Sequence, residues 1–74
     1  SAPNLRGTNT VNPIGTILSV AMMCRYSLGL ESAATAIETA VHHVLENGVM
    51  TPDLGGSSTT SEVGDAVLAQ LKIL

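Results

Sequence analysis

The stretch NPIGTILSVAMMCRYSLG, residues 12–29, decides the fold, because it holds a complete helix with both of its end signals. Asn12 is a preferred N-cap residue, and Pro13 suits the first helical position because it has no N–H to leave unpaired. Gly29 is placed to end the helix in a left-handed conformation. Apolar side chains recur at helical spacing, and others fill the opposite side: Ile14, Ile17, Leu18, Val20, Ala21, Met22, Met23, Cys24 and Leu28. The pattern predicts a helix over residues 13–28 that is apolar nearly all round, which is typical of a helix inside a larger body.

Two further helices are predicted, over residues 32–47 and 60–73. Ser32 is the expected N-cap of the first, and Gly48 follows its end. Thr59 and Glu62 fit the capping box that starts the second. Residues 1–12 have the composition of a loop, and residues 49–58 that of a link and turn, in which Val49 and Met50 form either a short strand or an extended link. The predicted fold class is a mainly α fragment, a loop plus three helices, in one partial domain over residues 1–74.

Composition limits the chain to one small domain. It has 74 residues, 45% of them apolar and 12% charged, and Tyr26 is its one aromatic side chain. So few charges with so much apolar surface indicate a buried piece of a larger protein rather than disorder. Cys24 alone cannot form an internal disulfide, which favours a cytoplasmic location.

Charge and hydropathy argue against two classes of partner. The net charge is −3, and the three basic residues, Arg6, Arg25 and Lys72, are dispersed, so a nucleic-acid surface is not expected. The apolar run over residues 14–24 is shorter than the roughly 18 residues that a membrane span requires. The opening residues show no signal-peptide pattern.

Three polar side chains share one face of the helix predicted over residues 32–47. Glu38, His42 and Glu46 follow one another at four-residue spacing. This spacing fits a surface metal site or ordinary pairing on a solvated face. The lack of a third ligating segment favours pairing, and we expect no metal ligands in this chain.

Four stretches of the sequence, taken together, resemble a known protein family. The strings SAPNL (residues 1–5), VNPIGTILSVAMMCRYSLGL (residues 11–30), AIETAVHHVLENG (residues 36–48) and TPDLGGSSTTSEVGDAV (residues 51–67) together resemble the C-terminal segment of a fungal-type 3-isopropylmalate dehydrogenase. The resemblance covers essentially the whole chain. The likeness to the fungal branch of the family rests on the segment GGSSTTSEVGDAV, residues 55–67. It implies a part of the α/β cofactor-binding domain of the isocitrate/isopropylmalate dehydrogenase family.

The implied activity is NAD-dependent oxidative decarboxylation of 3-isopropylmalate in leucine biosynthesis, assisted by Mg²⁺ or Mn²⁺, in an enzyme that is normally a homodimer. Isocitrate and homoisocitrate remain alternative substrates. The family's catalytic residues and metal ligands lie upstream, so none is expected in this chain. Tyr26 does not correspond to the catalytic tyrosine, and we interpret it as a packing residue with a tethered hydroxyl.

The resemblance carries over the adenosine side of the NAD site. The corresponding residues are Ser1, Ala2, Pro3, Asn4, Leu5 and Asn12. Leu5 would give an apolar wall for the adenine, and Asn12 would offer amide hydrogen bonds while capping the following helix. Asn4 stands where the family has an Asp, which weakens the expected preference for NAD over NADP, and Arg6 beside it could favour a phosphate. Thr8-Asn9-Thr10 stands where many relatives have a Lys-Gly-type turn.

Two functions are therefore open. The chain is a part of a 3-isopropylmalate dehydrogenase that needs the remainder of that chain for catalysis. Alternatively, it is a non-catalytic helical interaction module or a piece of a diverged paralogue.

Overall fold

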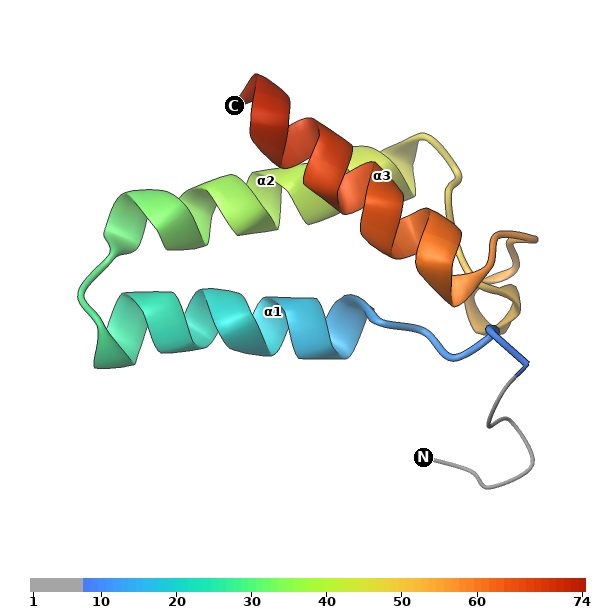
Figure 1. Ribbon diagram of the computed structural model, residues 1–74, viewed down its shortest axis with the longest axis horizontal. Helices are drawn as coiled ribbons and strands as arrows, with labels where there is room; N and C mark the ends of the chain where they lie inside the picture. The colour runs from blue at the N-terminus through green and yellow to red at the C-terminus, as the bar shows by residue number, and fades with distance from the viewer. Residues whose placement is uncertain (1–7) are drawn as a thin grey trace.

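A computed structural model describes residues 8–74 and contains three α-helices (Figure 1). Their bounds, with those of one π-helical turn and one 3-10 turn, are α1 Ile14–Met22, η2 Met23–Ser27, α2 Glu31–Glu46, η3 Pro52–Leu54 and α3 Thr60–Ile73. No strand occurs among these described residues, so residues 49–58 form a link rather than a strand. The predicted mainly α fold, a loop plus three helices, is confirmed.

The helices form a thin body in which α2 is the central element. α1 and α2 run antiparallel, and α3 crosses over α2 (Figure 1). α2 packs against both of the other helices, whereas α1 and α3 make no close backbone contact with each other within the described part of the chain. The molecule measures 37 × 25 × 17 Å. A body this thin leaves much of each helix uncovered.

Small apolar side chains make up the core where the three helices meet. Val41 and Val44 of α2 face Val63 and Val67 of α3, and these four are at most 4% exposed. Ile14 brings the start of α1 into the same cluster. Three alanines have no exposed surface, namely Ala21, Ala34 and Ala40. Close packing of alanines and valines lets the helices approach one another without any large buried side chain.

The first helix departs from regular α geometry at its C-terminal end. α-Helical hydrogen bonding ends at Met22, and the chain continues as the π turn η2. The Leu28 N–H donates to the Met23 carbonyl at 3.2 Å, a bond across five residues. The prediction of one regular helix over residues 13–28 missed the π turn. Apolar residues lie on every side of this helix, so the sequence has no periodicity that could change where the hydrogen-bond pattern changes. Gly29 does take a left-handed conformation, with φ of 66°.

The predicted start of the second helix is wrong by one residue. α2 begins at Glu31 with Leu30 as N-cap, and Ser32 lies exposed inside the first turn. Leu30 is held there because its N–H donates to the Cys24 carbonyl at 2.7 Å, while its own carbonyl accepts from Ala34. Backbone contacts with the preceding turn therefore replaced the side-chain cap. The helix also ends one residue early, at Glu46.

An ion-pair cluster ties η2 to α2. Arg25 donates to Glu38 through both terminal nitrogens, at 2.7 and 2.8 Å, and to Glu31 through Nε at 2.6 Å. These bonds raise the pKa of Arg25 and lower that of Glu38, chiefly through the hydrogen bonds between the two side chains. Two-pronged pairing fixes the guanidinium plane, so the π turn is locked against α2.

We expect Arg25→Met to lower the thermal midpoint of the protein modestly, by an amount that depends on pH. Because the pKa of Glu38 is lowered in the folded state, the pairing stabilises the fold above the ordinary pKa of 4.5 and is lost as the pH falls through the lowered value. The difference between parent and variant should therefore be largest near neutral pH and shrink in acid. Thermal unfolding between pH 7 and 3 measures it, with exposed Lys72→Met as control. A difference that does not change with pH contradicts the prediction.

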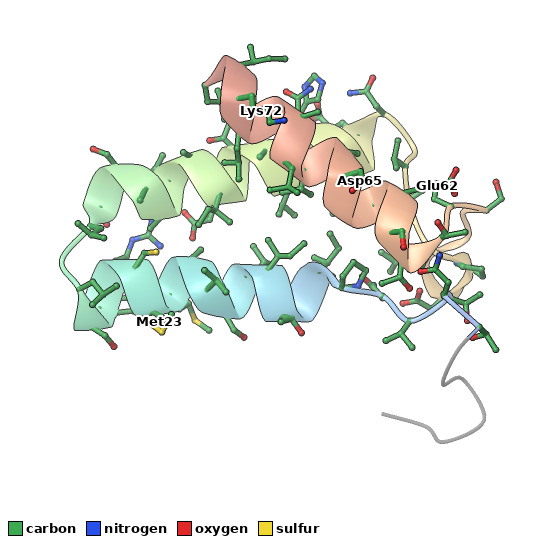
Figure 2. The ribbon with its side chains drawn as sticks, viewed as in Figure 1. Met23, Glu62, Asp65 and Lys72 are labelled. Atoms are coloured by element: carbon green, nitrogen blue, oxygen red, sulfur yellow. The ribbon has the colours of Figure 1, made fainter. Side chains whose placement is uncertain are left out.

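Large apolar side chains remain exposed on two helices. Met22 and Met23 are about half exposed, at 52% and 51%, and Met23 lies on the side of the first helix that faces away from α2 (Figure 2). On α3, Leu68 is 57% exposed. Tyr26 is 78% exposed, so the expectation of a packed tyrosine is wrong for the described structure: the π turn directs it outward. None of the described helices is both long enough and apolar enough to cross a membrane.

Candidate functional site

Asn12 is the one predicted cofactor-binding residue that the structure describes. Ser1, Ala2, Pro3, Asn4 and Leu5 lie outside the described residues, as does Arg6. Asn12 stands directly before α1, at the end of the molecule where the link between α2 and α3 also lies (Figure 1). The candidate site is therefore built from residues 8–12 and from the segments that hold them.

Asn12 makes two hydrogen bonds that fix its side chain. Its Oδ1 accepts from the Ile14 N–H at 2.9 Å. The N-cap of α1 is Pro13, without a side-chain cap, so the predicted N-cap at Asn12 and the predicted helix start at residue 13 are each wrong by one residue. Asn12 Nδ2 donates to Asp53 Oδ2 at 2.9 Å, across 41 residues. Among residues 8–74, these two bonds use one of the two amide N–H groups and one of the two oxygen lone pairs. Asn12 is thus held in one orientation.

Asp53, at the centre of η3, is the partner that orients Asn12. The buried Thr51 hydroxyl donates to Asp53 Oδ1, so each carboxylate oxygen has a partner. The bond from Thr51, and after it the bond from Asn12, holds the pKa of Asp53 below its usual range. The carboxylate is therefore ionised at neutral pH and accepts from both neighbours.

Gly56 closes this turn by a close backbone approach. A Cβ at this position would lie 2.1 Å from the Met50 carbonyl oxygen, nearer than any real contact allows. The same oxygen accepts from the Ser58 N–H at 2.8 Å, and the Gly56 N–H donates to the Thr51 carbonyl at 3.2 Å. The backbone on both sides of Asp53 is consequently fixed.

A second anchor joins the loop to the start of α3. Asn9 has φ of 58°, a left-handed conformation that Asn and Gly tolerate best. Its Oδ1 accepts from the Ser61 N–H at 3.1 Å and from the Ser61 hydroxyl at 3.0 Å, across 52 residues. Its carbonyl accepts from the Thr60 N–H at 2.8 Å, and the Thr60 hydroxyl donates to the Val11 carbonyl at 2.6 Å. Residues 9–12 are therefore held at both ends.

Sequence reasoning missed four residues of this site, namely Asn9, Asp53, Thr60 and Ser61. The TPDLGG string predicts a turn and contributes to the family resemblance, and Asn9 belongs to a tripeptide that departs from many relatives, but neither pattern indicates that the two segments meet. A signal was present, because Asn in a turn is the residue that best replaces Gly at positive φ.

The polar face of α2 carries pairs rather than a metal site. His42 Nε2 lies 2.7 Å from Glu46 Oε1, and Glu38 is engaged by Arg25 instead. Among residues 8–74, no group of three or more His, Cys, Asp or Glu side chains lies close enough to hold a metal ion.

An apolar groove of about 420 Å³ lies between α1 and α3, above α2. Its walls are Ile17 and Val20 of α1 and Leu68 and Leu71 of α3, with Ile37 of α2 as its floor. Asp65, labelled on α3 in Figure 2, is the one charged residue in its lining. Asn12 does not line the groove, but Ser61, which bonds Asn9, does, so the groove borders the polar site at the start of α3.

Comparison with known proteins gives a consistent result. Residues 1–67 match the family model described as isocitrate/isopropylmalate dehydrogenase. The chain is 63% identical over 71 residues to a 3-isopropylmalate dehydrogenase of Alternaria alternata, which covers 96% of this chain and 19% of that protein. It is 60% identical over 74 residues to 3-isopropylmalate dehydrogenase A of Aspergillus niger, covering 100% of this chain and 20% of that protein.

A 3-isopropylmalate dehydrogenase of Sordaria macrospora is 58% identical over 72 residues, which is 97% of this chain and 20% of that protein. The chain thus spans about a fifth of the length of the curated relatives it matches. A family match over residues 1–67, with this identity to fungal 3-isopropylmalate dehydrogenases, confirms the predicted resemblance, and the chain belongs to the isocitrate/isopropylmalate dehydrogenase family.

Proposed function

We propose that residues 1–74 form the adenosine-binding part of an NAD-dependent dehydrogenase that oxidises and decarboxylates 3-isopropylmalate in leucine biosynthesis. The observation that supports this most is Asn12, the described member of the family's cofactor loop. It is held by Ile14 and Asp53, and its second amide N–H and second oxygen lone pair would meet the ligand. Ser1, Ala2, Pro3, Asn4 and Leu5 complete the proposed site.

The chain's part in the reaction is binding and orientation. Bound NAD would supply the hydride acceptor for the oxidation, and Mg²⁺ or Mn²⁺, held by residues outside this chain, would supply the Lewis acid for the decarboxylation. Asn12 would hold the adenine edge while Leu5 walls the ring. Positioning one end of the dinucleotide in this way fixes the approach of the other end to the substrate. We place the catalytic residues and metal ligands in the remainder of the dehydrogenase chain.

The exposed apolar surface supports a larger assembly. The groove between α1 and α3 is one uncovered apolar area, and the half-exposed Met22 and Met23 are another, on a body only 17 Å thick. Isolated soluble domains seldom leave such areas bare. We propose that the remainder of the dehydrogenase covers them, in a cytoplasmic homodimer as in the family.

A hybrid enzyme tests the proposal. Residues 1–74 replace the aligned segment of the Aspergillus niger enzyme, which matches all of this chain. We expect NAD reduction with 3-isopropylmalate and Mg²⁺ by the hybrid enzyme, and none above the blank by the 74-residue chain alone. A hybrid with the Sordaria macrospora segment is the control for the exchange. An active control with an inactive hybrid enzyme contradicts the proposal, as does turnover by the chain alone.

The same exposed surface also favours a second candidate, a helical interaction module that buries its apolar face against another protein. This module would self-associate or require a partner in solution. Sedimentation of the 74-residue chain separates the possibilities: a stable, cooperatively unfolding monomer would contradict both the module and the need for a covering dehydrogenase body.

A further inference from the structure

The N-terminal backbone of α3 divides its hydrogen bonds between two partners. The first N–H groups of a helix have no partner inside the helix. The Glu62 N–H donates to Thr59 Oγ1 at 3.1 Å, and the Glu62 carboxylate accepts from the Thr59 N–H at 2.8 Å. These two bonds form a capping box. The Thr60 and Ser61 N–H groups donate instead to Asn9. Half of the helix end is therefore satisfied locally, and half by a residue at the other end of the chain.

This division identifies what Asn9 does for the fold. α3 already has a capping box in Thr59 and Glu62, at the point labelled by Glu62 in Figure 2. The bonds to Asn9 therefore satisfy the two N–H groups that the capping box leaves open, and they also hold the loop against the start of α3. The left-handed φ of Asn9 turns its carbonyl and its side chain toward the same helix end.

Asn9 is also the first of three successive anchors. The Val11 carbonyl accepts from the Thr60 hydroxyl, and Asn12 is bonded to Asp53. All three anchors lie within residues 9–12, and the last of them, Asn12, is itself one of the proposed adenosine-binding residues. A loop fixed in this way loses less conformational entropy when a ligand binds, and so binds more tightly.

We propose that Asn9, clasped by Thr60 and Ser61, is a positioning residue that pre-organises residues 9–12, Asn12 among them, and thereby raises affinity for NAD. The proposal rests on the proposed function of residues 1–12. Asn9 acts through the loop and through Asn12, and it leaves the chemical step unchanged.

Four variants of the hybrid enzyme test this assignment. Asn9→Gly keeps the left-handed backbone and removes the two bonds from Ser61 to the Asn9 side chain, while the bond from the Thr60 N–H to the backbone carbonyl remains. Ser61→Ala removes the hydroxyl donor alone. Asn9→Asp keeps an oxygen acceptor and places a negative charge at a helix N-terminus, which is favourable. Ser57→Ala is the matched control, because Ser57 is an exposed serine of the same link.

We expect a graded effect on NAD binding alone. Asn9→Gly should raise the KM and the Kd for NAD roughly threefold to tenfold, as expected for the loss of one or two hydrogen bonds. Ser61→Ala should raise them less, because the Ser61 N–H remains. Asn9→Asp and Ser57→Ala should match the parent. The kcat and the KM for 3-isopropylmalate should not change in any variant.

The contrary results separate a failure of the positioning role of Asn9 from a failure of the proposed function. An unchanged KM for NAD in Asn9→Gly and Ser61→Ala, in an active hybrid enzyme, overturns the positioning role and leaves the proposed function standing. A fall in kcat together with a lowered thermal midpoint overturns it too, because that result indicates a purely structural contact. A parent hybrid enzyme without NAD-dependent activity contradicts the proposed function itself.

Discussion

Gly56→Ala should prevent the hybrid enzyme from folding to an active form, with a loss of stability of at least about 3 kcal/mol. The added Cβ would lie 2.1 Å from the Met50 carbonyl oxygen and 2.7 Å from its carbon, and both are backbone atoms that cannot rotate away. Relief requires the turn to open, which breaks the bonds from Ser58 to Met50 and from Gly56 to Thr51. Soluble yield and urea unfolding measure the loss.

The matched control for this change is Gly15→Ala. A Cβ at Gly15 meets nothing within 4 Å, and Gly15 lies in the first turn of α1. Alanine favours a helix over glycine by about 1 kcal/mol, so this variant should be neutral or slightly more stable. If Gly56→Ala unfolds at the same urea concentration as the parent, then the backbone at Gly56 does not lie against the Met50 carbonyl as described.

The same variant links the fold to the proposed cofactor site. Opening the turn displaces Asp53, and Asn12 then loses the acceptor that orients its amide. Any folded fraction of Gly56→Ala should therefore also bind NAD more weakly than the parent. Gly56 would thus control the proposed adenosine site through Asp53 and Asn12, although it is not itself one of the proposed cofactor-binding residues.

Local signals in the sequence were enough to predict α3. Its capping box, Thr59 with Glu62, is a pattern within four residues, and the helix spans Thr60–Ile73 as expected. The bond from the Ile14 N–H to the Asn12 side chain is equally local, although Pro13 and not Asn12 is the N-cap of α1. Such features depend on neighbouring residues only, so the sequence displays them directly.

Contacts between distant residues could not be predicted in this way. Asn9 and Ser61 are 52 residues apart, and Asn12 and Asp53 are 41 residues apart. No periodicity connects such pairs, because they meet only after α2 has returned the chain to the start of α1. The prediction of where α2 starts was wrong for a related reason. The bond from the Leu30 N–H to the Cys24 carbonyl of η2 fixes Leu30 as the N-cap in place of Ser32. The proposed site consists largely of such distant pairs. The family resemblance predicts its loop, whereas the bonds that anchor the loop are visible only in the structure.

Val63→Asp is the second substitution expected to unfold the hybrid enzyme. Val63 is 1% exposed and lies in the cluster that joins α2 and α3, beside Val41 and Val44. Burial of a polar group without a partner costs roughly 1–3 kcal/mol in proteins, and an ionised carboxylate costs more. A domain has only about 5–15 kcal/mol of net stability, so several kcal/mol lost at the junction of two helices separates them.

Two milder variants at the same position show whether charge or shape causes the loss. Val63→Thr keeps the shape and adds one unpaired hydroxyl, and Val63→Ala removes two methyl groups and leaves a small void. We expect both to stay folded with lowered urea midpoints, and Val63→Asp alone to lose soluble yield and activity together. If Val63→Asp instead unfolds at the same midpoint as Val63→Thr, then water reaches the carboxylate and α3 is not packed on α2 through this residue. The Asn9 clasp would then have no fixed helix end to hold, because the position of Thr60 and Ser61 depends on that packing.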